Sequence, residues 1–189
     1  SMLRGALDAV VDGSRQQLRW LEDRDDDVDA RYAEIVTYLG RLSKENLSDV
    51  QAEQVRDFLA AANYLENIGD TIETNLVAAG DERLARGVEM SEGTLARLGK
   101  MHTMVLHTVE DAIRALVDGD RELAARVLAA KGTVAEMAYE LEHHLAERLT
   151  ADAPNRLHAF RLETDVIENL RRVTYFARRI AKIVTTSPE

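Results

Sequence analysis

The sequence predicts an all-α protein made of two pseudo-symmetric three-helix repeats, a helical bundle of six helices. The first observation is composition: 189 residues include only two prolines and 5% aromatic residues, while good helix formers are abundant. The second is that apolar residues recur at helical spacing along almost the whole chain, separated by short breaks. The third is a faint similarity between the two halves of the sequence, which is typical of an internal repeat.

Three helices are expected in the first half. The first covers about residues 3–21 and ends in the acidic run 22–27, which we expect to close one helix and cap the next, because carboxylates suit a helix N-terminus. The third runs from a plausible N-cap, Ser48, to about residue 79, where Gly80 and Asp81 break it. The core faces of the second and third helices are expected to be Val28, Tyr32, Ile35 and Leu39, then Phe58, Ala62, Leu65, Ile72 and Leu76.

Three more helices are expected in the second half. The fourth covers about residues 84–117 and the fifth continues to Thr150. The break at 151–154 contains Pro154, which cannot continue a helix, and the sixth helix then runs from about 155 to 186.

An alignment of the two halves supports the repeat. The segment 63–68 matches 165–170, with Glu-Asn between apolar neighbours in both. Val28, Tyr32 and Ile35 fall in the same way on Val134, Ala138 and Leu141. We therefore expect one domain over 1–189, with repeat one at about 3–80 and repeat two at about 81–187.

Composition also excludes several classes of function. The chain has no cysteine, which rules out disulfide scaffolds, Cys-ligated zinc and thiol catalysis. A net charge of -10 argues against nucleic acid as a partner, and no apolar run approaches the ~18 residues of a membrane span, so direct membrane insertion is not expected. There is no glycine-rich phosphate loop and no nucleophile elbow, so we find no positive case for an enzyme.

The sharpest cluster of chemical groups is acidic. On the third helix Glu66 and Asp70 are spaced i,i+4 along one edge of the apolar stripe, so their charges repel unless something compensates. The second helix offers Asp25, Asp26 and Asp29, which face these acids if the two helices are neighbours. Carboxylates from different helices suit a hard or borderline metal, whereas basic side chains or water would compensate equally well. Both interpretations stay open on spacing alone.

Charge is also distributed unevenly along the chain. Residues 49–82 contain eight acids and one base, and residues 155–182 contain seven bases and three acids. Intramolecular pairing and solvated faces explain this simply. The alternative is that the two long helices present opposite charges, one to cations and one to an acidic partner or lipid headgroups.

The string Leu-Glu-Asn-Ile-Gly-Asp at 65–70, followed by Asn75 and Leu76, resembles PhoU-like domains. With the segments 38–43 and 163–173, the chain is most similar to the cytoplasmic C-terminal region of bacterial sodium/phosphate cotransporters. This resemblance implies a non-enzymatic regulatory or accessory domain of a sodium-dependent inorganic phosphate transporter, acting in the control of phosphate uptake. It places the domain on the cytoplasmic side of the inner membrane, as one piece of a longer protein.

The resemblance also implies partners and a cofactor. The partner is the transmembrane transporter region of the same chain, and a homodimer is left open. In the first repeat, iron or zinc would be held by Glu66 and Asp70, with Asp25, Asp26 and Asp29 as contributors from the second helix. In the second repeat Arg172 and Lys131 replace two of the acids. We therefore expect that second site to be lost, with Glu168 paired to an arginine.

Two alternatives remain. The first is a free-standing PhoU-type regulator that contacts a phosphate ABC transporter and its sensor kinase. It differs from the leading hypothesis in having no hydrophobic region upstream. The second is a carboxylate-bridged di-metal oxidase or hydrolase, which needs Glu-x-x-His pairs on two helices. The sequence offers one such pair, at 140–143, and no second.

Overall fold

The structure is a computed structural model that describes residues 2–150 and 155–186. Within these residues it contains helices and no strand. The elements are α1 (Met2–Val11), α2 (Arg15–Leu42), α3 (Asp49–Asp70), η1 (Thr71–Val77), α4 (Ala78–Arg86), α5 (Glu92–Asp118), α6 (Arg121–Arg148) and α7 (Arg156–Thr186). Because α3, the π-helical η1 and α4 follow one another without a break, they form one long helix, and the described residues contain the six helices expected from the sequence.

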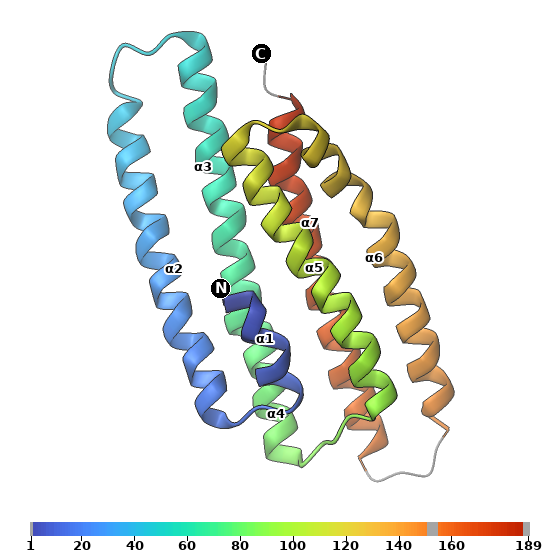
Figure 1. The fold of residues 1–189 in the computed structure, drawn as a ribbon. Helices are drawn as coiled ribbons and strands as arrows, with labels where there is room; N and C mark the ends of the chain where they lie inside the picture. The colour runs from blue at the N-terminus through green and yellow to red at the C-terminus, as the bar shows by residue number, and fades with distance from the viewer. Residues whose placement is uncertain (1, 151–154, 187–189) are drawn as a thin grey trace.

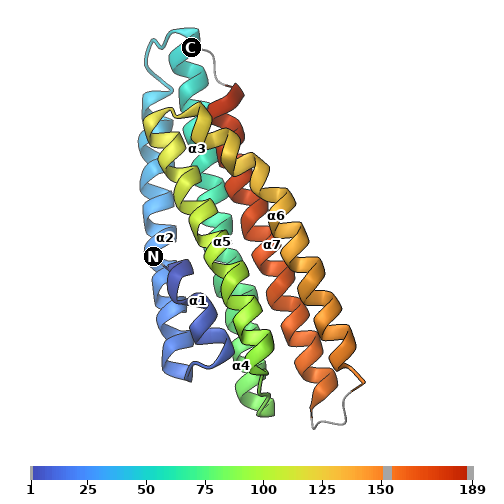
Figure 2. The ribbon, with the colours of Figure 1, turned by 45° about the vertical axis from the view of Figure 1, so that its right-hand side comes forward.

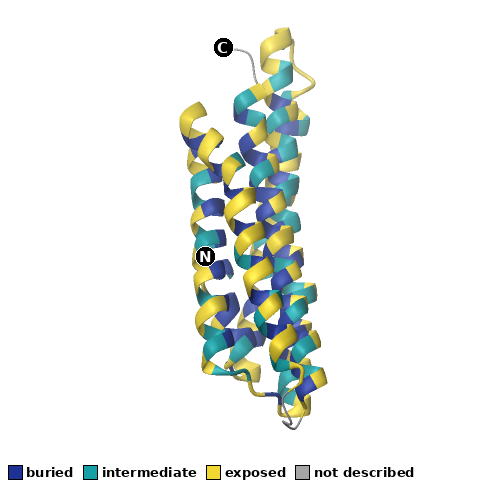
Figure 3. Ribbon diagram, turned by 90° about the vertical axis from the view of Figure 1, so that its right-hand side faces the viewer, coloured by how far each residue is buried: buried dark blue, intermediate teal, exposed yellow. Residues whose placement is uncertain are grey.

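The helices form one elongated bundle made of two sets of three (Figure 1). In the second set α5, α6 and α7 lie side by side along nearly their whole lengths (Figure 2). In the first set α2 pairs with α3, and the short α1 packs beside the lower half of α2 and against η1 and α4 (Figure 1). Contacts between α3 and α7 join the two sets, and the buried residues face this shared interior (Figure 3).

Helix ends follow local sequence signals. Ser48 and Ser91 cap α3 and α5, each accepting a hydrogen bond from a backbone N–H in the first turn, and Asp120 does the same for α6. Gly87 and Gly119 end α4 and α5 in the left-handed conformation, with φ of 60° and 66°. A side chain is strained at such angles, so glycine is the favoured residue at both ends.

The helix boundaries expected at the acidic run and at Gly80 are wrong. The acidic run 22–27 lies inside α2, because the chain breaks earlier, at Asp12 and Gly13, and Ser14 with Gln17 forms a capping box that starts α2. Gly80 does not break a helix either. A Cβ atom there would lie 2.6 Å from Leu18 Cδ2, so this glycine permits a close crossing between α4 and α2.

Other expectations differ less. The expected start of the fourth helix at about 84 is also wrong, since Leu84 belongs to α4 and α5 begins at Glu92. The ends expected for the fifth and sixth helices agree with α6 and α7 to within two residues. The break at 151–154 lies outside the described residues. We propose that the two repeats divide at 87–91, between α4 and α5.

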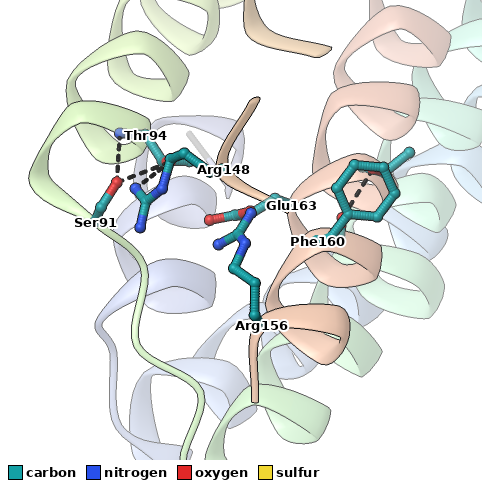
Figure 4. Close-up of polar contacts among 7 residues, drawn as sticks. Ser91, Thr94, Arg148, Arg156, Phe160 and Glu163 are labelled. Carbon is teal, nitrogen blue, oxygen red and sulfur yellow. Dashed lines mark hydrogen bonds and ion pairs between the residues drawn. The ribbon is translucent and has the colours of Figure 1, made fainter. Parts of the chain in front are cut away.

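A buried ion pair lies at the lower end of the second set (Figure 4). Arg156 Nη2 lies 2.7 Å from Glu163 Oε2, and their side chains are only 8% and 0% exposed. Nearby, Arg148 of α6 donates a 3.4 Å hydrogen bond to Thr94 Oγ1 of α5. Removing one member of a buried pair strands the other charge, so this pair ties the start of α7 to its own second turn.

No helix among residues 2–150 and 155–186 has an apolar stretch long enough to cross a bilayer.

Candidate functional site

Carboxylates from α2, α3 and η1 gather where α2 packs on the long third helix. Asp25 of α2 lies against Gly69, where a Cβ atom would stand only 2.6 Å from Asp25 Oδ1 and 3.3 Å from Val28 Cγ1. The mid-helix glycine therefore makes room for the Asp25 carboxylate at the surface of α3. We define the acidic cluster as Asp25, Asp29, Glu66, Asp70 and Glu73.

The electrostatics show that these five groups interact. The pKa of Asp25 is raised to about 6, first by burial and then by the charges of Asp29, Glu73, Asp70 and Glu66. Burial also raises the pKa of Glu66, with the charges of Asp70 and Asp29 adding to the effect. Asp25 Oδ1 is buried and has no hydrogen-bond partner among the described residues. No described lysine or arginine forms an ion pair with the cluster. Two of its carboxylates accept neutral hydrogen bonds from adjacent residues: Glu66 from Asn67 at 3.2 Å and Glu73 from Thr74 at 2.8 Å.

The oxygen donors of the cluster suit a cation, but their positions are not close enough together to hold one. Its donors are carboxylate oxygens, which hard cations prefer, and one of them is a buried oxygen that lacks a partner. Yet no three His, Asp or Glu side chains in the described part of the chain are placed to hold a metal ion together. A bound ion would therefore require rotation of side chains such as Glu66 and Asp70 toward Asp25.

Four of the five predicted ligands come together in this cluster. Asp25 and Asp29 face Glu66 and Asp70, as expected if α2 and α3 are neighbours. Asp26 is exposed and does not contribute to either raised pKa. Glu73, which spacing places on the same edge, joins the cluster.

The acidic motif ends at a change of helix type. Asp70 is the last residue of α3, and the wider π-helical turn η1 begins at Thr71. Thr71 Oγ1 donates a 2.7 Å hydrogen bond to the Asn67 carbonyl, within the last turn of α3. π-helical turns inside α-helices occur often at functional sites, and here the turn sets the direction of Glu73 relative to Glu66.

The equivalent place in repeat two is basic. A pocket of about 310 Å³ opens between α6 and α7. It is lined by Lys131, Val134, Ala135, Arg171, Thr174, Tyr175 and Arg178, and we call it the basic pocket. In the alignment of the halves Lys131 stands where repeat one has Asp25, Arg171 where it has Gly69, and Tyr175 where it has Glu73.

The expected pairing of Glu168 is confirmed. Arg171 Nη1 lies 2.9 Å from Glu168 Oε1 and 3.4 Å from Glu142 Oε1. Arg172, which replaces the counterpart of Asp70, lies over the Phe176 ring instead, at 5.9 Å from its centre. The sequence identified Lys131 and Arg172 as departures from the acidic pattern, but gave no sign that Thr174, Tyr175 and Arg178 line a pocket with Lys131.

An apolar groove runs along repeat one above the start of α1. It consists of two neighbouring hollows of about 340 Å³ and 460 Å³ that share Ile35, Ala62 and Leu65. Residues of α5 also line these hollows: Val109, Ile113 and Leu116. Ile35 and Phe58 were expected in the core, and that expectation is wrong: they are 41% and 48% exposed. The reason is the length of α1, whose 10 residues cover only part of the α2 and α3 faces, whereas α5 covers α6 and α7 with 27 residues.

Comparison with known proteins places this fold and these motifs in one family. The PhoU domain matches residues 1–76 and 98–184. The chain belongs to the PhoU domain family. The crystal structure of PhoU from Pseudomonas aeruginosa superposes with a TM-score of 0.87 over 97% of this chain and 86% of that chain, at 19% sequence identity. This agreement confirms the all-α fold of a PhoU domain.

Sequence relatives are of two kinds. YjbB of Salmonella typhimurium and of Escherichia coli K12, named as an inorganic phosphate export protein, is 23% and 22% identical over 188 residues. The chain is matched over its full length and spans 34% of the length of these relatives. A PhoU homologue of Clostridium acetobutylicum, named as a phosphate-specific transport system accessory protein, is 39% identical over 70 residues, 37% of this chain and 31% of that protein.

Proposed function

We propose that this PhoU domain is a non-enzymatic regulatory domain of a sodium-dependent inorganic phosphate transporter, located on the cytoplasmic side of the inner membrane. The observation that carries the proposal is that the whole chain aligns with one third of proteins named for phosphate export. A domain of this size, attached to a larger transport region, acts by contact and not by turnover. Whether it controls uptake or release is decided by measuring phosphate flux in both directions.

The apolar groove supplies the contact surface in this proposal. Its occupant is an apolar helix of the transporter region, lying along α2 and α3 in line with α1. Two features support a helix: the groove begins at Met2 and Leu3 in the first turn of α1, and in repeat two the corresponding path is filled by α5. Docking of this helix would bury the exposed side chains of Ile35, Tyr38 and Phe58. The binding free energy gained is ~25 cal/mol per Å² of apolar surface removed from water.

Phosphate flux in cells expressing the full-length protein tests this contact. Phe58→Asp places a charge in the groove, and we expect it to abolish the domain's control of flux while the isolated chain keeps its helicity. The matched control is Tyr139→Asp, since Tyr139 of α6 is 70% exposed and outside the groove. If both variants control flux like the wild type, the groove is not the contact surface.

The acidic cluster adds a second element to the proposal, a divalent cation such as iron or zinc in repeat one. Asp25, Asp29, Glu66 and Asp70 would hold it, and it would neutralise the charge that raises the pKa of Asp25. Binding of such an ion would also fix α2 against α3. Differential scanning fluorimetry with added Zn²⁺ checks this: we expect a higher Tm for the wild type and no change for Asp25→Asn.

The second candidate is a free-standing PhoU-type regulator of phosphate ABC transport. The observation that favours it is that 86% of the Pseudomonas aeruginosa PhoU chain is covered by this one. Reading the natural gene upstream of residue 2 separates the two. A multi-helix hydrophobic region supports the transporter domain, and its absence supports the free-standing regulator.

A further inference from the structure

The basic pocket of repeat two is a preformed hollow with cationic side chains on both of its helices. Lys131 enters from α6, and Arg171 and Arg178 enter from α7. Its volume of about 310 Å³ exceeds what one tetrahedral oxyanion needs. No acidic side chain of the described residues lines the pocket.

The three cationic side chains differ in how many hydrogen bonds and ion pairs they already form with the protein. Arg171 is paired with Glu168 and Glu142, so its charge is largely compensated. Arg178 donates only its Nε, at 3.1 Å to the Leu128 carbonyl, which orients the guanidinium and leaves its two Nη groups without a described partner. Lys131 forms no hydrogen bond or ion pair with any described residue and is exposed. Lys131 and Arg178 are thus available to an anion.

Two uncharged residues complete the lining. Thr174 is 3% exposed, and its hydroxyl donates 3.0 Å to the Leu170 carbonyl, which leaves the oxygen as an acceptor. Tyr175 is 51% exposed and is held by an edge contact with Phe176, with ring centres 5.4 Å apart. A hydroxyl acceptor beside two cationic donors suits an anion that carries a proton of its own, such as monohydrogen phosphate.

We propose that the basic pocket between α6 and α7 binds inorganic phosphate, and that this is the place where repeat two senses the transported ion. The site itself follows from the pocket, and only the choice of phosphate among oxyanions rests on the proposed function. Asp25 of repeat one aligns with Lys131 of repeat two, so this position carries opposite charges in the two repeats. At the two other aligned positions, repeat one has Gly69 and Glu73 where repeat two has Arg171 and Tyr175.

Isothermal titration calorimetry of the chain with sodium phosphate, at constant ionic strength, tests the proposal. We expect Lys131→Gln to weaken binding about fivefold and Arg178→Gln about tenfold, since each removes a charge-assisted hydrogen bond. The matched control is Arg126→Gln, because Arg126 is exposed on α6 and lies outside the pocket, and its affinity should stay within about twofold of the wild type. Circular dichroism of each variant shows whether it is folded.

The proposal is overturned if phosphate does not bind, or if Lys131→Gln binds as well as Arg126→Gln. It is also overturned if the chain binds phosphatidylglycerol vesicles through Lys131 but not free phosphate, because the pocket would then recognise a lipid headgroup. Flux measurements separate this inference from the proposed function. A domain that still controls flux without binding phosphate keeps the proposed function and loses this site.

Discussion

The acidic cluster of repeat one and the basic pocket of repeat two occupy the same position in two copies of one helical unit. In repeat one a glycine on the third helix admits the carboxylate of Asp25, whose pKa is raised first by burial and then by four neighbouring acids. In repeat two Arg171 stands at the glycine's position and is paired with Glu168 and Glu142. The comparison shows that both repeats place charged side chains between their second and third helices, and that a few substitutions decide the sign of that charge.

The starts of the last long helix of each repeat, α3 and α7, differ as well. Repeat two has the buried Arg156–Glu163 pair, and the alignment places Gln54 and Ala61 at these positions in repeat one. Glu163→Ala leaves the buried Arg156 unpaired, and we expect it to lower the free energy of unfolding by about 3–5 kcal/mol.

The double variant Arg156→Gln with Glu163→Ala copies repeat one and should recover most of that loss. Urea denaturation of the single and double variants measures both effects. Equal losses in the two variants would show that the cost is a cavity and not a stranded charge.

Burial of Asp25 beside the other acids of the cluster gives the next largest effect. The pKa of Asp25 is raised from 3.8 to about 6, so the folded state holds this proton more tightly than the unfolded state, and stability falls as pH rises through that window. Allowing for the partial exposure of Asp25, the loss is about 1 kcal/mol. Asp25→Asn should therefore be more stable than the wild type at pH 8 and equal to it at pH 4, in thermal melts with chelator. A flat difference across this range would contradict the raised pKa of Asp25.

The double variant Glu66→Ala with Asp70→Ala is expected to change stability less. Neither residue is paired with a base among the described residues, so in chelator the Tm should shift by only a few degrees, as for a change of under about 1 kcal/mol. A large loss of Tm would mean that these acids are structural and not ligands.

Gly69→Ala should have the smallest effect on stability. Alanine favours the helix by about 1 kcal/mol over glycine, and this offsets the displacement of the Asp25 carboxylate, whose oxygen would lie 2.6 Å from the new Cβ. The response of Tm to Zn²⁺ should nevertheless disappear, since Asp25 can no longer lie against α3. A retained response would show that the glycine is not part of the cation site.

The fold was largely predictable because helical periodicity and composition act over whole helices. The boundary errors arose where a local signal conflicted with packing. The acidic run 22–27 resembles a helix end in composition. Leu18 and Leu21, just before the run, are nevertheless buried in α2, and the helix continues through the run to Leu42. Glycine often ends a helix, which is why a break was expected at Gly80. Here the missing side chain instead lets Leu18 pack against α4.

The sites were only partly predictable. Helical spacing placed Glu66 and Asp70 on one edge, and neighbouring helices brought in Asp25 and Asp29. The exposure of Phe58 and Ile35 depends on how far α1 reaches along α2 and α3, which periodicity does not determine. The basic pocket depends on which residues of α6 and α7 face each other across a hollow, and only coordinates show that.

The measurement that tests the opposite ligand preference of the two repeats most directly is equilibrium dialysis against Zn²⁺, followed by elemental analysis of the protein. Three chains are compared: the wild type, Asp25→Asn and Lys131→Gln. Opposite charges predict no more than one zinc per chain, lost in Asp25→Asn and retained in Lys131→Gln. Two or more zinc ions per chain, or equal binding in Asp25→Asn and the wild type, would contradict it.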